Sequence, residues 1–221
     1  MIEPELEAIT AEILATIAAE VPEYARPLEG RFGRGIRTGV GEALRQFVAL
    51  VRNPAQGRPG REVYVELGRG EFRQGRTLDS LQAAYRVGAR VAWRRIAAAG
   101  RRAGLEAEPL SLLAEAIFAY IDELAADSVD GYAEAQREVA DLRRRRRREL
   151  ADLLLREPPP EPADVAAAAR AAGWELPRRA AAVACPEARL GDVARALPPD
   201  VLTLVVDGLG CLLLPDPDGP G

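Results

Sequence analysis

No proline interrupts the chain between Pro109 and Pro158, and this long stretch limits the folds that the chain can adopt. Proline is tolerated in the first turn of a helix but disrupts a helix interior, so the spacing predicts one continuous helix between the two prolines. Such a helix has about 45 residues and a length of about 70 Å, which is more than a compact domain needs. We therefore expect its second half to project from its own domain or to pair with another helix.

Four shorter helices are predicted before this one, because apolar residues recur there at every third or fourth position. Pro22, Pro54 and Gly75 end three of them. Thr77 is expected to cap the fourth, with Asp79 in its first turn. The predicted helices cover residues 3–19, 32–51, 63–72 and 78–103.

Four prolines at positions 158, 159, 160 and 162 make the sharpest change in composition along the chain. Beyond them the pattern predicts a helix, a short strand, a second helix and two apolar runs separated by Asp207-Gly208, which is a hairpin signal. The fold class is therefore α plus α/β. We expect an all-α bundle with a long last helix over residues 1–156, a proline-rich linker over 157–162 and a small, partial α/β unit over 163–221. About 60 residues are marginal for such a unit, which favours a piece of a longer protein.

The chain contains no histidine, and this absence narrows its chemistry. A Ser-His-Asp triad, a Cys-His pair and an HExxH zinc site all require that residue. The only cysteines, Cys185 and Cys211, form no CxxC pair. Four acidic residues could support acid-base catalysis, but their spacing is also that of an ordinary exposed helix surface, which we favour: Asp122, Glu123, Asp127 and Asp130. We expect no enzyme activity, cofactor or bound metal.

The N-terminus lacks the basic segment of a signal peptide, and no stretch approaches 18 consecutive apolar residues. The sequence therefore predicts a cytoplasmic protein without a membrane span.

Every basic residue is an arginine, and two groups of arginines are candidate binding sites. Residues 143–148 are six consecutive arginines, suited to phosphate or nucleic acid, yet on a helix they spread around the whole circumference, which favours a solvated surface. The second group lies along one face of the fourth helix and is a candidate ligand or anion site: Arg86, Arg90, Trp93 and Arg94. The alternative, which we favour, is a surface stripe paired with the acidic first helix, whose glutamates are Glu3, Glu5, Glu7 and Glu12.

Apolar residues along the second half of the long helix approximate the spacing of a short coiled-coil seam. The candidate seam residues are Val139, Leu142, Leu150 and Leu153. This pattern predicts a homodimer.

Residues 75–93, GRTLDSLQAAYRVGARVAW, resemble the central helix of the RsbRD-type N-terminal domain of PucR/CdaR-like bacterial transcriptional regulators. Residues 148–155, the prolines, and residues 171–177, AAGWELP, resemble the connector and the start of the CdaR GGDEF-like domain in the same regulators. The chain has no Gly-Gly-Asp-Glu-Phe signature, so the second likeness implies a fold and no cyclase activity.

The resemblance implies the signal-input and dimerisation portion of a helix-turn-helix regulator. Its DNA-binding domain would lie outside these 221 residues, and its effector would be an unidentified small molecule or protein. The alternative is a stand-alone signalling scaffold of the RsbR co-antagonist type. The downstream α/β unit argues against that alternative, because such co-antagonists are expected to carry a STAS-type domain instead.

Overall fold

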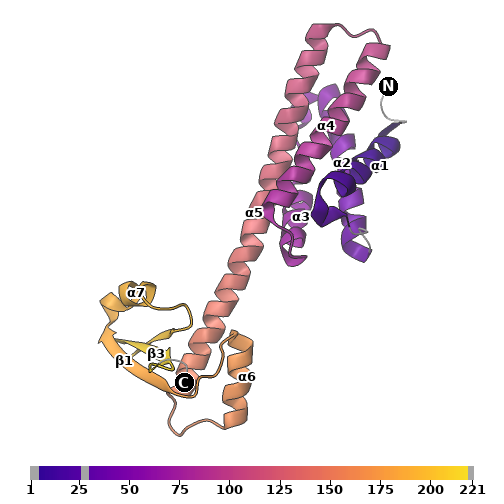
Figure 1. The fold of residues 1–221 in the computed structure, drawn as a ribbon. Helices are drawn as coiled ribbons and strands as arrows, with labels where there is room; N and C mark the ends of the chain where they lie inside the picture. The colour runs from indigo at the N-terminus through magenta and orange to yellow at the C-terminus, as the bar shows by residue number, and fades with distance from the viewer. Residues whose placement is uncertain (1–4, 26–29, 219–221) are drawn as a thin grey trace. The chain divides into compact units, whose positions relative to one another are not determined.

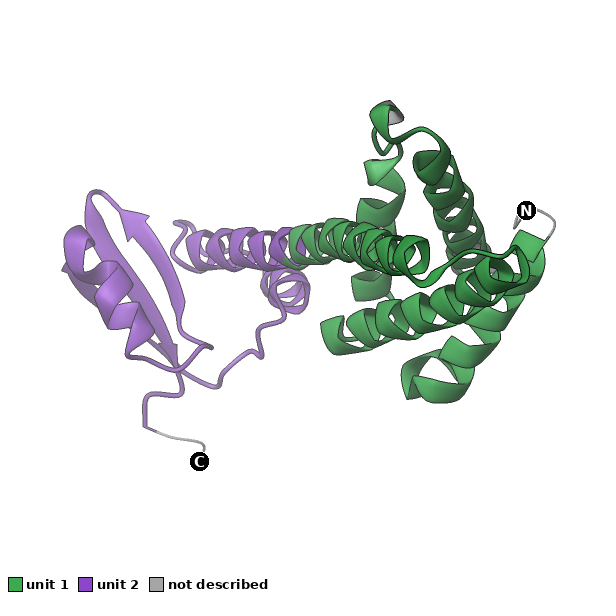
Figure 2. Ribbon diagram, turned by 90° about the horizontal axis from the view of Figure 1, so that it is seen from above, with its two compact units in different colours: residues 1–136 green, residues 137–221 purple. Residues whose placement is uncertain are grey.

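The computed structural model describes residues 5–25 and 30–218, which form two compact units (Figure 1). The first unit covers residues 1–136 and the second covers residues 137–221 (Figure 2). Glu3, at which the first helix was predicted to begin, lies outside the described residues. No described helix is long and apolar enough to cross a membrane.

All five helices predicted before the proline cluster are present, with boundaries within a few residues of those expected. The long helix α5 is continuous and runs through the division between the units, so its residues up to Gln136 belong to the first unit. Two short 3-10 turns, Pro22–Tyr24 and Pro54–Gln56, stand before and after α2. The helices are α1 (Leu6–Glu20), α2 (Gly30–Arg52), α3 (Arg61–Arg73), α4 (Leu78–Arg102) and α5 (Ala107–Leu154).

The turn between α3 and α4 follows from local sequence chemistry. Gly75 adopts a left-handed conformation with φ of 72°. Its amide donates to the Phe72 carbonyl, and the amide of Arg76 donates to the Glu71 carbonyl, which is the Schellman pattern of helix ends. The Thr77 hydroxyl then accepts from the Ser80 amide, which confirms Thr77 as the N-cap of α4. This turn returns the side chain of Arg76 toward Glu71.

The core of the first unit is built from the apolar faces of its helices. Ile9 and Ile13 of α1 pack with Val91 of α4, while Leu44 of α2 and Ile117 of α5 belong to the same cluster. Burying each such side chain contributes roughly 1.5–3 kcal/mol, so this cluster is the main stabilising feature of the unit.

α3 and α5 approach so closely that their backbones touch at two glycines. A Cβ atom at Gly68 of α3 would lie 1.8 Å from the Ser128 carbonyl oxygen of α5, and a Cβ at Gly131 of α5 would lie 1.9 Å from the Val65 carbonyl oxygen of α3. The Ser128 hydroxyl, fully buried, also donates to the Tyr64 carbonyl at 3.0 Å. Only glycine can occupy these two positions without displacing a helix.

The second unit contains the last turns of α5, two helices and a three-stranded sheet. β3 (Leu209–Pro215) lies between β1 (Ala180–Pro186) and β2 (Leu202–Val206) and is antiparallel to both, so β1 and β2 run parallel and are joined through α7 (Glu187–Arg195). Asp207 and Gly208 have φ values of 49° and 78° at the turn from β2 to β3, as the hairpin prediction required. The remaining helix of this unit is α6 (Pro162–Ala172), which precedes β1.

A separate small core holds the second unit together. Leu150 of α5 is fully buried against Leu202 and Leu213 of the sheet. Trp174, just after α6, joins this cluster, and its indole nitrogen donates to the Asp200 carbonyl at 2.6 Å. α7 packs on the other face, where a Cβ at Gly210 would lie 2.9 Å from Leu190.

Candidate functional site

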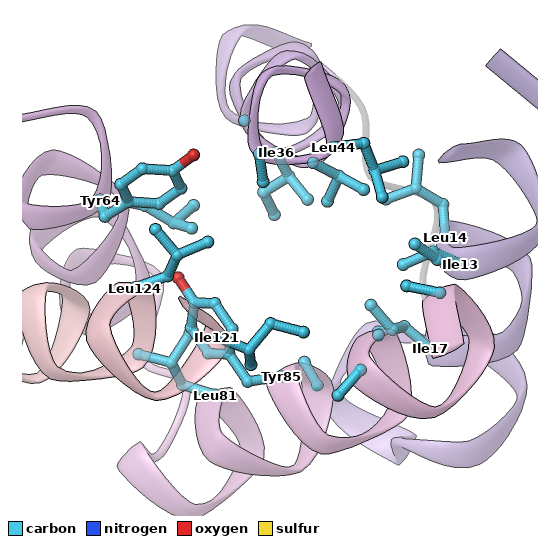
Figure 3. Close-up of a pocket in the computed structure, with 18 of the residues that line it drawn as sticks. Ile13, Leu14, Ile17, Ile36, Leu44, Tyr64, Leu81, Tyr85, Ile121 and Leu124 are labelled. Atoms are coloured by element: carbon cyan, nitrogen blue, oxygen red, sulfur yellow. The ribbon is translucent and has the colours of Figure 1, made fainter. Parts of the chain in front are cut away.

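An apolar cavity of about 110 Å³ lies within the helices of the first unit (Figure 3). Side chains from five helices converge on it, among them Tyr64 of α3 and Tyr85 of α4. Its aliphatic walls include Ile13, Ile17, Ile36, Leu44, Ile121 and Leu124. Apolar cavities of roughly 150 Å³ in other proteins stay dry and bind benzene, so this space is of the size of a small organic ligand.

The cavity reaches the backbone of α2 at Gly39. Gly39 is buried, yet a Cβ atom built there would meet no atom within 4 Å. On α4, Gly88 is similarly placed, where a Cβ would stand 3.7 Å from Ile13, an ordinary contact distance. The space therefore exists partly because small residues face it from two helices.

Glu71 of α3 is a buried acidic residue in the cavity wall, with 1% of its surface exposed. A guanidinium nitrogen of Arg76 forms an ion pair with a Glu71 carboxylate oxygen at 3.3 Å. The same guanidinium lies over the Tyr24 ring, 5.0 Å from the centre of the ring. Burial raises the pKa of Glu71, while hydrogen bonding with Tyr24 and the charge of Arg76 act in the opposite direction. Burial also raises the pKa of the Tyr24 hydroxyl, so that residue stays neutral.

The raised pKa of Glu71 predicts a pH dependence of stability. A carboxyl that binds its proton more tightly in the folded state contributes stability at low pH and loses it as pH rises through the folded-state pKa. The Glu71→Gln variant lacks this ionisation, so it should gain stability relative to the wild type as pH rises above 4.5. Urea unfolding of both proteins at a series of pH values measures the difference in their free energies of unfolding. If that difference does not change with pH, the prediction is wrong.

Three further tyrosines line the cavity, and they differ in whether their hydroxyl groups have a hydrogen-bond partner. The Tyr85 hydroxyl is 2.7 Å from the Ser128 hydroxyl, and the Tyr120 hydroxyl donates to the Ala43 carbonyl at 3.1 Å. The Tyr64 hydroxyl is buried and has no hydrogen-bond partner among the described residues. The Tyr120 hydroxyl is close enough to influence the pKa of Tyr64, but the two groups do not meet hydrogen-bond geometry.

The arginine face of α4 lies outside this cavity. Arg86, Arg90 and Arg94 are exposed, while Trp93 is half-buried against the core of the unit. Arg90 pairs with Glu20 of α1. Two further pairs use glutamates that the sequence analysis named, but arginines outside the predicted stripe: Glu12 of α1 with Arg95, and Glu5, just before α1, with Arg102. Of the residues predicted for this site, Arg90 therefore forms an ion pair with α1.

The predicted seam residues on α5 fall into two groups. Val139 and Leu142 are exposed, with 55% and 47% of their surface accessible to solvent. Leu150, in contrast, is fully buried in the core of its own unit, and Leu153 is half-buried. Leu150 therefore cannot contribute to pairing between chains while this unit is folded, which corrects that part of the prediction.

Two members of the six-arginine run form hydrogen bonds inside the second unit, to which the run itself belongs. Arg146 donates to the Ala171 carbonyl at 3.2 Å, near the C-terminal end of α6, and Arg147 donates to the Val201 carbonyl at 3.2 Å. A cation at a helix C-terminus is favourable. These two side chains thus have a structural role.

Three of the four acidic residues considered for catalysis form an ionic network with α3 and the segment before it. Arg58 contacts both Glu123 and Asp127, and Arg61 contacts both Asp127 and Asp130. Asp127 is buried by these contacts. The cluster joins the segment 58–61 to α5.

Sequence reasoning did not identify the cavity. One signal was available: small residues recur four positions apart on two of the five helices that line it, at Gly39 and Ala43 of α2 and at Ala84, Gly88 and Ala92 of α4. The unpartnered hydroxyl of Tyr64 and the burial of Glu71 depend on contacts between distant segments, so no local pattern indicates them.

Comparison with known proteins gives one match, to a protein family. The family model described as the PucR-like N-terminal domain matches residues 1–155. No curated protein and no solved structure shows a significant match.

Proposed function

Because the chain belongs to the PucR-like N-terminal domain family through residues 1–155, we propose that it is the signal-input and dimerisation portion of a PucR-family transcriptional regulator. In this proposal the cavity of the first unit receives the effector. The cavity is the observation that carries the proposal: it lies between five helices, so an occupant contacts all of them at once. The family is regulatory, and regulation through such a site requires no catalytic group.

The second unit fits the start of a ferredoxin-like, GGDEF-like domain. Its order β-α-β-β, with the third strand inserted between two parallel strands, is the first part of a split βαβ arrangement. α7 covers only part of its face of the sheet, since Val183 and Val205 on that face are 45% and 49% exposed. A second helix, which a complete domain of this kind has, would cover such residues.

The proposed mechanism uses α5 as the connection. The occupant of the cavity contacts Ile121 and Leu124 of α5, while Leu150 of the same helix belongs to the core of the second unit. A change in the packing of the first unit would alter the position or pairing of this helix. A DNA-binding domain outside these 221 residues would then be presented differently.

The intact mass of the native gene product, isolated from its own cells, tests the proposal. A mass above 23.8 kDa, with peptides beyond Gly221 that form a helix-turn-helix, supports it. A mass equal to that of this chain overturns it, and the stand-alone scaffold of the co-antagonist type then becomes the better explanation.

Dimerisation is tested on the exposed part of α5. If Val139 and Leu142 pair two chains, light scattering should give a mass near twice 23.8 kDa for the wild type and near 23.8 kDa for Val139→Asp combined with Leu142→Asp. Both side chains are exposed, so the folded units should survive the change. Ala140→Asp, an exposed position about 130° around the helix from the middle of this pair, should keep the wild-type mass. An unchanged mass in the double variant excludes this seam.

A further inference from the structure

The shape and chemistry of the cavity restrict the kind of effector that can enter it. This inference rests on the proposed function, in that it specifies the ligand of the same site. The cavity, at about 110 Å³, accommodates one ring or a short branched chain, and a larger molecule would have to separate the helices.

The wall of the cavity disfavours a charged ligand. Glu71 is the only side chain with a formal charge among the described residues that line it, and Arg76 already pairs with that carboxylate. An anion would lie near Glu71 without a cation of its own. A cation would have to displace Arg76 and lose its hydration among aliphatic side chains. Burying an unpaired charge is far more costly than burying a neutral group, so the site selects neutral molecules.

One polar group remains available to such a molecule. Tyr64 lines the cavity, and its buried hydroxyl lacks a hydrogen-bond partner among the described residues. Figure 3 shows the ring of Tyr64 beside the cavity, with its hydroxyl directed toward the helix that carries Ile36 and Leu44. A buried hydroxyl without a partner is destabilising, and a ligand that supplies an acceptor removes that cost.

We propose that the cavity binds a neutral molecule of the size of a single ring that carries one oxygen acceptor, and that this oxygen accepts a hydrogen bond from the Tyr64 hydroxyl. The rest of the ligand contacts Ile13, Ile17 and Leu124. Phenol is the simplest probe of this class. Toluene has a similar shape without the oxygen, and benzoate adds a charge.

Titration calorimetry of the 221-residue chain with these three probes tests the proposal. Phenol should bind about fivefold to tenfold more tightly than toluene, as one hydrogen bond predicts. Benzoate should give no measurable binding. Tyr64→Phe should lower the affinity for phenol to that for toluene or below it, because the phenol hydroxyl then loses its partner, and should leave toluene binding unchanged. Equal affinities for phenol and benzoate, or a Tyr64→Phe variant that binds phenol like the wild type, overturn the proposal.

Two glycines of α2 provide a matched pair that locates the binding. Gly39→Leu places a side chain in the cavity and should abolish binding of phenol and of toluene. Gly35→Leu adds the same side chain one turn earlier, at an exposed position with free space, and should bind like the wild type. Circular dichroism verifies the fold of both variants, and if Gly39→Leu does not fold, the Tyr64→Phe comparison decides.

These titrations do not depend on the remainder of the regulator. A native product of 23.8 kDa would contradict the proposed function and leave the ligand class intact. Failure of phenol to bind would contradict the ligand class alone.

Discussion

Replacing Gly131 with alanine is expected to destabilise the first unit by about 3 kcal/mol, with a fall in melting temperature of about 10 °C. The added Cβ would stand 1.9 Å from the Val65 carbonyl oxygen, which is part of the α3 backbone and cannot rotate away as a side chain can. α3 would have to move, and with it the hydrogen bond from Ser128 to the Tyr64 carbonyl. Thermal unfolding followed by far-UV circular dichroism measures the effect.

Gly35→Ala is the matched control for this change. It is also a helical glycine, and a Cβ there meets nothing within 4 Å. Alanine favours the helix over glycine by about 1 kcal/mol, so this variant should equal or exceed the wild type in stability. Similar melting temperatures for Gly131→Ala and the wild type would show that α3 and α5 do not approach as closely as described.

Asp127→Asn is expected to lower the free energy of unfolding by about 2–3 kcal/mol, because it removes the buried charge that two arginines share. Arg58 and Asp127 are both nearly buried, at 14% and 10% side-chain exposure, and Arg61 reaches the same carboxylate at 3.0 Å. Removing one partner from a buried ion pair leaves the other charge poorly solvated. Arg58 retains an ion pair with the exposed Glu123. The expected loss of stability is therefore smaller than for a buried ion pair in which the remaining charge has no partner. Urea unfolding at neutral pH measures this cost.

Asp130→Asn provides the comparison on the same helix. Asp130 also pairs with Arg61, at 2.6 Å, but its side chain is 58% exposed. Exposed pairs contribute little, so this variant should lie within about 0.5 kcal/mol of the wild type. Equal effects of the two substitutions would mean that burial does not govern this network.

Features that depend on neighbouring residues could be predicted from the sequence. The cap at Thr77, the helix end at Gly75 and the hairpin at Asp207-Gly208 each follow from the backbone preferences of one or two residues. The long helix followed from the absence of proline between 109 and 158. These are local properties, and the structure confirms them.

Features that depend on which helices pack together could not be predicted in the same way. The sequence indicated an acidic α1 beside a basic α4, but the actual partners, such as Glu12 with Arg95, depend on the offset between the two helices. Leu150 has the spacing of a seam residue, yet the second unit buries it. The cavity arises where side chains from five helices fail to fill the space between them, and that mismatch has no signature in any single helix.

The contact of Gly68 and Gly131 with the opposing backbones also determines which parts of the first unit can change shape. With no side chain between them, α3 and α5 have no layer of soft contacts along which to slide, so locally they behave as one rigid body. The opposite wall of the cavity consists of side chains from α1, α2 and α4, which pack through ordinary apolar contacts. A ligand that expands the cavity would therefore change the position of that wall relative to α3 and α5, and α5 would move only together with α3.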